Sequence, residues 1–265
     1  MLLRITHTTR YTYDQPVVYA LQQVRLTPRD TRQQIVRDWV ITLDGGKKET
    51  AYTDQHGTLT DLVSVTPGGT EIAITAHGTV ETQDTAGVLG QAYGRTPLWY
   101  FLKSTALTEA GDAIGDISRQ VARHDSLLEG LHALSAAILS AAPYRIGETY
   151  SATSAEAALT GGSGVCQDHA QIFVAAARAA GVPARYVSGY LMMNDRVDQD
   201  ASHAWAEAHV DGLGWVGFDI SNGISPDARY VRLAVGLDYR EAAPLSGMRM
   251  GDANESMIVS LQIQQ

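Results

Sequence analysis

Residues 163–190 read SGVCQDHAQIFVAAARAAGVPARYVSGY, and this run predicts a helix followed by a strand. The part from Cys166 onward is rich in alanine and poor in β-branched residues, a composition that favours helix. Gly181 and Pro183 end the helix, and the apolar residues after them predict a strand. Cys166 is the only cysteine of the chain, and it falls in the first turn of the expected helix.

A β-hairpin whose register can be argued is predicted from His203 to Ile220. Its first strand alternates alanines with larger polar and aromatic residues, and its second alternates large apolar residues with Gly and Asp. If Val210 pairs with Gly214 across a three-residue turn, the two apolar faces coincide, whereas a slip of one residue would mix apolar and polar faces. The expected pairs are Ala208 with Val216, Ala206 with Phe218 and Ala204 with Ile220. The same register puts His203 and Asp219 on one face as diagonal neighbours.

A thiol in the first turn of a helix lies near the positive end of the helix dipole, which favours the nucleophilic thiolate. A cysteine nucleophile also needs a base within hydrogen-bond reach and an acceptor that orients this base. Cys166, His203 and Asp219 have these three chemical types and are the candidate catalytic residues. The supporting candidates are Trp205, Asp168 and Gln167. Should the side chain of Asp219 point away from His203, Glu207 is the next candidate for the acid.

The residue types leave two other assignments open. His169 lies one helical turn after Cys166 and is an alternative base. Cys166, His169, His203 and His209 are also of the types that bind zinc. His203 and His209 are six residues apart on a strand, about 20 Å at roughly 3.3 Å per residue, which is too far for both to bind one ion. We therefore expect no metal and no cofactor.

The composition narrows the class of protein. The 265 residues are 45% hydrophobic and 18% charged, which excludes a disordered or extended charged chain. The formal net charge is −9, so we expect neither a nucleic-acid partner nor an anionic membrane surface. Arg4 and Arg10 interrupt the first apolar residues and no cleavage-site pattern follows, so we expect a cytoplasmic protein without a secretory signal.

The first part of the chain, from Leu2 to about Thr82, has short alternating runs broken by turn sequences. This pattern predicts an antiparallel β-sandwich that braces the second domain or shapes access to its site. We expect its histidines to be surface or strand residues without a catalytic role; they are His7, His56 and His77. Beyond it the periodicity changes towards that of helices, which places a β-sandwich domain at residues 1–95 and a second domain at residues 96–265.

Four blocks of the sequence, in order, resemble the core of the transglutaminase-like superfamily, specifically its bacterial branch described as candidate cysteine proteases. The blocks are Gly164-Val165-Cys166-Gln167-Asp168, Gly181-Val182-Pro183-Ala184-Arg185-Tyr186-Val187-Ser188-Gly189-Tyr190, Ser202-His203-Ala204-Trp205-Ala206-Glu207 and Gly214-Trp215-Val216-Gly217-Phe218-Asp219. The strand-rich first part resembles the β-domain that precedes this core in the branch, and the tail from Tyr230 fits the closing strands.

The resemblance implies an α+β fold in which an N-terminal antiparallel β-sandwich is followed by a papain-like core, with the nucleophile helix packed on an antiparallel sheet. Carried over by position, the nucleophile is Cys166, the general base is His203 and the orienting acid is Asp219. Many relatives have Arg and an aromatic residue where this chain has Gln167 and His169, so its substrate contacts are expected to differ.

The residues and the resemblance together predict a cysteine-nucleophile acyl-transfer enzyme acting on amide bonds of peptides or proteins. Hydrolysis, as in a protease or amidase, is the expected reaction, with transfer to an amine as a second outcome. The alternatives are a catalytically silent scaffold that binds peptides and a zinc-dependent hydrolase. By analogy with serine triads, Asp219→Asn is expected to lower the rate on the order of 10⁴-fold.

Overall fold

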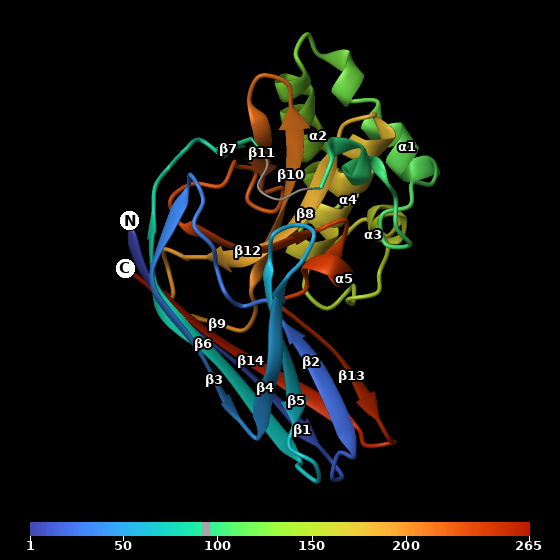
Figure 1. Ribbon diagram of the computed structural model, residues 1–265. Coiled ribbons are helices and arrows are strands. Elements are labelled where there is room, and N and C mark those ends of the chain that lie inside the picture. Colours follow the sequence, from blue (N-terminus) through green and yellow to red (C-terminus); the bar gives the residue numbers. More distant parts are fainter. Residues whose placement is uncertain (92–95) are drawn as a thin grey trace.

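The computed structural model describes residues 1–91 and 96–265, which form three antiparallel sheets and a group of helices (Figure 1). The strands are β1 (Leu2–Tyr13), β2 (Tyr19–Val24), β3 (Gln34–Asp44), β4 (Gly46–Thr53), β5 (Leu59–Val65), β6 (Glu71–Thr82), β7 (Val88–Gly90), β8 (Ala184–Leu191), β9 (Asp198–Gln199), β10 (His203–Val210), β11 (Gly214–Phe218), β12 (Tyr230–Gly236), β13 (Leu245–Met250) and β14 (Glu255–Gln264). The helices are α1 (Asp112–Ser118), α2 (Leu127–Ala141), α3 (Ala155–Gly161), α4 (Cys166–Ala179) and α5 (Tyr239–Ala242), with the 3-10 helices η1 (Leu98–Leu102) and η2 (Val121–Arg123). Within the described ranges, no helix has both the length and the apolar character needed to cross a bilayer.

Two of the sheets form the predicted sandwich, with strand orders β3-β6-β1-β14-β9 and β13-β2-β5-β4. In β1, every second residue is buried, and Leu3 and Ile5 pack in one hydrophobic cluster with Val63 and Val65 of the facing sheet. Alternating burial of this kind is what two packed antiparallel sheets require. The predicted α+β fold with an N-terminal sandwich is confirmed.

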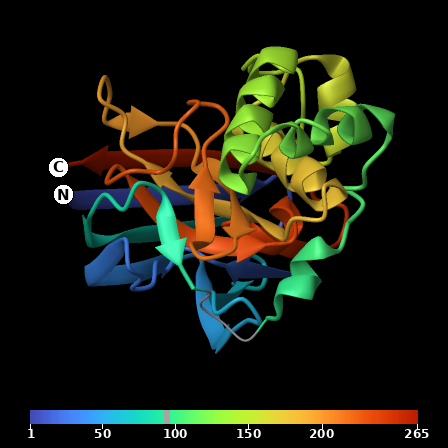
Figure 2. The same ribbon diagram turned by 90° about the horizontal axis from the view of Figure 1, so that it is seen from above.

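The end of the chain lies in the sandwich, a pairing that the sequence pattern does not reveal. The prediction that the tail from Tyr230 supplies closing strands holds for β12, which pairs with β8 in the core sheet. However, β13 pairs with β2 and β14 pairs with β1, so the two termini lie side by side at one edge of the molecule (Figures 1 and 2). The division at residue 95 stays a prediction.

The third sheet, ordered β12-β8-β10-β11-β7, carries the helices on one face, which Figure 2 shows from above. α4 packs against β10 and β8, and Phe173 on this helix stacks on Phe218 with 4.9 Å between ring centroids. The sandwich covers the other face, where His7 bonds the hydroxyl of Tyr190 on β8. Since both faces are covered, all residues of β8 and nearly all of β10 are buried.

The predicted hairpin register is confirmed where the strands form a ladder. Val210 pairs with Gly214 across a three-residue turn, and Ala208 and Ala206 oppose Val216 and Phe218. Gly214 has a φ of +79°, which glycine adopts without the steric cost of a Cβ. The β10–β11 ladder ends at Phe218, so the expected pair of Ala204 with Ile220 lies outside it. Asp219 instead forms a bridge with Ile224.

A buried ion-pair cluster lies on the polar face of β10. Glu207 accepts hydrogen bonds from Arg185 at 2.6 Å and from Arg232 at 3.1 Å, and it is 3% exposed. The guanidinium of Arg185 also lies 3.9 Å from the centroid of the Trp215 ring. Glu207 is thus engaged by two arginines.

Because removal of one partner leaves buried charge uncompensated, we expect Glu207→Gln to lower the free energy of unfolding by about 3–5 kcal/mol. Urea titration followed by circular dichroism measures this loss. The control is Asp116→Asn, which breaks the exposed pair with Arg119 and should cost less than about 1 kcal/mol. Equal losses in the two variants would show that the buried cluster contributes no more to the free energy of unfolding than an exposed ion pair does.

Candidate active site

Cys166 is the first residue of α4, and its neighbours fix the start of this helix. Oδ2 of Asp168 accepts a hydrogen bond from the backbone N–H of Val165 at 2.8 Å and from the hydroxyl of Thr149 at 2.6 Å. A Cβ on Gly164 would lie 2.7 Å from Cβ of Asp168, so glycine permits this close approach. Asp168 therefore caps the helix that presents the thiol.

Gln167, the second supporting candidate beside the thiol, ties α4 to the loop before α3. Its side-chain N–H donates to the backbone oxygen of Ser151 at 3.3 Å. Cys166 itself is partly exposed and packs against the hydrophobic cluster that includes Tyr186 and Tyr239. The thiol thus lies at the edge of the core, with the loop at Ser151 beside it.

His203 and Asp219 form a buried hydrogen-bonded pair. Nε2 of His203 lies 2.6 Å from Oδ2 of Asp219, and the two residues are 9% and 0% exposed. The contact predicted from the hairpin register is therefore confirmed. This bond leaves Nδ1 of His203 free, and Cys166, His203 and Asp219 have the chemical types of a nucleophile, a base and an orienting acid.

Two residues that the sequence did not suggest complete the surroundings of Asp219. The hydroxyl of Tyr230 donates to Oδ2 at 2.6 Å, and the side-chain amide of Asn222 donates to the same oxygen at 2.7 Å. The backbone N–H of Asn222 also donates to Oδ1 at 3.2 Å. Asn222 lies three residues after Asp219, a turn spacing that could have marked it. Tyr230 comes from β12 and has no such local signal.

The pKa values of the pair follow from burial and from its charged partners. Burial disfavours charge on His203, but hydrogen bonds and negative charge from Asp219 and Cys166 outweigh it and raise the pKa of His203 to about 10. Burial likewise opposes ionisation of Asp219, yet the partners His203, Tyr230 and Asn222 hold its pKa below the usual value. Burial, followed by the charge of Asp219, raises the pKa of Tyr230, so its hydroxyl stays a donor.

Trp205, the third supporting candidate, covers the imidazole. Its ring stacks on that of His203 with 6.4 Å between centroids, and it meets Tyr230 edge-on at 5.5 Å. Trp205 is 3% exposed. Its contacts hold the ring plane of His203 on one side while the bond to Asp219 holds the ring edge.

The alternative base, His169, is occupied on both ring nitrogens. Nε2 donates to the backbone oxygen of Ala142 at 2.6 Å, and Nδ1 accepts from the hydroxyl of Ser221 at 2.8 Å. Burial lowers the pKa of His169 and favours the neutral ring. His169 therefore links α4 to the ends of α2 and β11 rather than acting on the thiol.

The zinc alternative finds no support in the geometry. His209 lies at the opposite end of β10 from His203 and packs edge-on against Trp215 at 5.6 Å. In the described part of the chain, no group of three His, Cys, Asp or Glu residues is placed to hold a metal ion.

Two parts of the chain match the models of known protein families. Residues 115–220 match the model of the transglutaminase-like superfamily, and residues 3–81 match that of the bacterial transglutaminase-like N-terminal region. The core and the N-terminal strands are thus each similar to transglutaminase-like proteins. The two matches cover the core that carries Cys166 and His203 and the first six strands of the sandwich.

Relatives of similar length share this organisation. An uncharacterized protein of Mycobacterium leprae is 29% identical over 280 residues, which cover 98% of each chain. An uncharacterized protein of Mycobacterium tuberculosis is 28% identical, over 96% of this chain and 90% of the relative. A crystal structure described as a "Putative Cysteine Protease" from Cytophaga hutchinsonii is similar over 100% of this chain and 92% of that chain, with a TM-score of 0.78 and 22% identity. At that identity the likeness shows a common fold.

The raised pKa of His203 gives this transglutaminase-like site a defined dependence on pH. A histidine with a raised folded pKa contributes stability that is complete below its unfolded pKa of about 6.5 and is lost as the pH rises through about 10. We therefore expect His203 to remain an imidazolium at pH 8 while His169 is neutral. Titration of the imidazole C–H signals by NMR, assigned with His203→Gln and His169→Gln variants, measures both. A His203 signal that titrates below pH 6.5 would contradict the expectation.

The convergence of three donors on Oδ2 alters the effect expected for Asp219→Asn. Tyr230 and Asn222 would turn the carbonyl oxygen of the new amide towards His203, so the imidazole would keep its acceptor and its tautomer. We expect kcat/KM to fall about 10²-fold through loss of the charge. Asp219→Ala removes the acceptor and should cost on the order of 10⁴-fold.

Steady-state kinetics of both Asp219 variants distinguishes the two contributions. As a control, Asp219→Asn combined with Tyr230→Phe loses a donor that orients the amide and should approach the loss of Asp219→Ala. Equal losses for Asp219→Asn and Asp219→Ala would refute this orienting role of Tyr230.

Proposed function

We propose that the chain is a cysteine-nucleophile acyl-transfer enzyme that acts on amide bonds of peptides or proteins, with hydrolysis as its main reaction. The observation that supports this most strongly is the buried bond between His203 and Asp219 beside a thiol at the start of a helix. A base held by an acid is what converts a cysteine into a nucleophile at neutral pH. The match of residues 115–220 to the transglutaminase-like superfamily supports the same reaction class.

In the proposed mechanism, the proton of the Cys166 thiol already rests on Nδ1 of His203, which is an imidazolium at neutral pH, and the thiolate sulfur attacks the amide carbonyl. Asp219 holds the ring through Nε2 and stabilises the imidazolium. His203 then protonates the leaving amine as the C–N bond breaks, which leaves a thioester on Cys166. Water, activated by His203, releases the acid and regenerates the thiol, and an amine in place of water gives a new amide.

The backbone at the start of α4 supplies a donor for the oxyanion. The first intrahelical bond at this end runs from the N–H of His169 to the carbonyl of Val165, so the N–H of Cys166 is not used within the helix. An N–H at this position would lie near the amide carbon of the substrate that the sulfur attacks. It can therefore stabilise the negative charge that develops on the carbonyl oxygen.

The test is to profile the protein against a library of peptide amides, with and without added primary amines, and to detect free acids and new amides by mass spectrometry. We expect turnover that iodoacetamide abolishes, because Cys166 is the only cysteine, and that EDTA leaves unchanged. Loss of activity with EDTA would favour a metal-dependent hydrolase. Peptide binding with no product under any condition would favour a silent scaffold.

A further inference from the structure

A groove of about 620 Å³ lies between the sandwich and the core, with β13 and β14 on one side and α5 on the other. We propose that this groove binds an extended, acidic segment of the substrate polypeptide and thereby selects the protein or peptide that reaches Cys166. This inference rests on the proposed function, because it names the class of substrate for the same site.

Two lining residues, Tyr239 and Ser151, connect the groove to the surroundings of Cys166. Tyr239 lines the groove, and it packs in the same hydrophobic cluster as Cys166. Tyr239 also meets Tyr186 edge-on, with 6.1 Å between ring centroids. Burial, followed by the negative charge of Cys166, raises the pKa of Tyr239. Ser151, another lining residue, accepts the hydrogen bond from Gln167, the residue after the nucleophile.

The charge of the groove is opposite to that of the protein. Arg240 and Arg249 line it, and neither forms an ion pair among the described residues, whereas the chain as a whole has a formal net charge of −9. Glu255 is the one carboxylate among the lining residues, against the two arginines. Two free guanidinium groups favour carboxylates of the bound segment.

The wall formed by β13 suits an extended backbone. β13 is the edge strand of its sheet, bonded to β2 on one side only. An extended peptide can add to such an edge through main-chain hydrogen bonds, while alternate side chains enter neighbouring pockets. Met248 and Met257 line the same groove and are 65% and 55% exposed, and flexible thioethers of this kind adapt to different apolar side chains.

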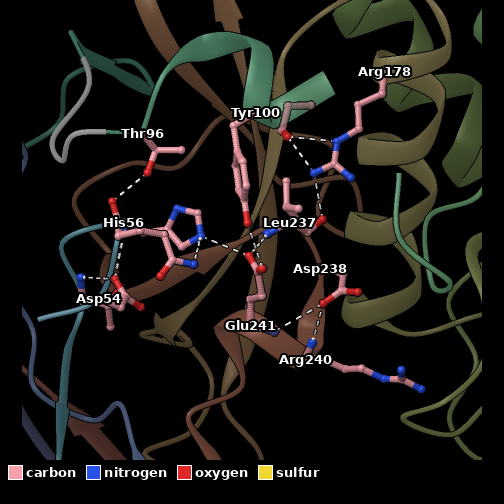
Figure 3. Close-up of polar contacts among 12 residues, drawn as sticks. Asp54, His56, Thr96, Tyr100, Arg178, Leu237, Asp238, Arg240 and Glu241 are labelled. Carbon is pink, nitrogen blue, oxygen red and sulfur yellow. Dashed lines mark hydrogen bonds and ion pairs between the residues drawn. The ribbon is translucent and has the colours of Figure 1, made fainter. Parts of the chain in front are cut away.

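The opposite wall, α5, is anchored by a polar network between the two parts of the molecule (Figure 3). His56 comes from the turn between β4 and β5, and its Nε2 lies 3.0 Å from Oε2 of Glu241 on α5. Glu241 also accepts from the hydroxyl of Tyr100 at 3.2 Å and from the backbone N–H of Leu237 at 2.8 Å. The prediction that His56 is a surface or strand residue is wrong, since His56 is 5% exposed and lies in a turn.

This network anchors α5 through Glu241 and does not use the side chain of Arg240. In Figure 3 the side chain of Arg240 extends away from the bonded cluster around Glu241. On the sandwich side, the guanidinium of Arg25 donates to the carbonyl of Ala243 at 3.2 Å and to the hydroxyl of Ser246 at 3.0 Å. Both acceptors line the groove, so Arg25 links the residue after α5 to β13.

Binding to a variant that cannot turn over tests the inference separately from catalysis. Fluorescent peptides of one sequence, carrying Glu, Gln or Lys at the same flanking positions, are titrated against Cys166→Ala and followed by anisotropy. We expect the Glu peptide to bind about tenfold more tightly than the Lys peptide, and R240E/R249E in the same background to reverse this order. The control, R119E/R123E, changes the net charge equally on the exposed surface near α1 and η2 and should keep the preference for Glu.

The outcomes separate the groove from the proposed reaction. Equal binding of the three peptides, or the same response in R240E/R249E and R119E/R123E, would overturn the groove assignment even if amides are hydrolysed. A Glu preference that depends on Arg240 and Arg249 supports the groove, and failure of the unsubstituted protein to process any of these peptides would then count against the acyl-transfer reaction alone.

Discussion

Cys166→Ala is expected to lower kcat on the order of 10⁶-fold, the size of the loss when the nucleophile of a serine triad is removed. Without the sulfur, no thioester forms, and the remaining rate comes from binding and from the N–H donor at the start of α4. The loss should be in kcat rather than KM, because the sulfur bonds the substrate carbonyl only as the reaction proceeds. Stopped assays with high enzyme concentration measure the residual rate.

The control for this variant is its fold. Cys166 is partly exposed at the first position of α4, where alanine is an excellent helix former, so the urea midpoint should stay close to that of the unsubstituted protein. A Cys166→Ala protein that folds normally and keeps more than a tenth of the activity would end the cysteine-nucleophile account.

His203→Ala is expected to produce a loss of similar size, on the order of 10⁶-fold in kcat, because a triad base and nucleophile act as one unit. Removal of the imidazole leaves the thiol without a proton acceptor and leaves Asp219 without its partner at 2.6 Å. Steady-state and single-turnover kinetics with the same amide substrate measure the effect.

The chain offers a matched control for this second variant. His209 lies on the same face of β10 but at its other end, so His209→Ala should keep nearly full activity. If His203→Ala keeps its activity and His169→Ala loses it, the base would be His169, and the assignment of the His203–Asp219 pair would be wrong.

Local patterns were sufficient for the parts of the site that lie on one helix and one hairpin. The alanine-rich run after Cys166 predicts α4, and the alternation of small and large residues fixes the β10–β11 register. Because side chains alternate along strands, that register puts His203 and Asp219 on one face of the hairpin, although the ladder itself ends at Phe218. The identity of the residue types then points to an acyl-transfer site, although their catalytic roles stay predictions.

Contacts between distant segments could not be predicted in this way. Tyr230 reaches Asp219 from β12, and nothing in its neighbourhood marks a hydroxyl that donates to a carboxylate. β14 pairs with β1 across almost the whole chain, a choice among sheet edges that strand patterns do not settle. Burial of His56 against Glu241 depends on the same packing of sandwich on core.

The most direct test of the central claim is to trap the acyl-enzyme. The protein is mixed with an amide or activated ester substrate, quenched in acid within the first turnover, digested and examined by mass spectrometry. We expect the acyl group on the peptide containing Cys166, and we expect the adduct to disappear with added hydroxylamine and in Cys166→Ala. Turnover without an adduct, or an acyl group on any other residue, would contradict it.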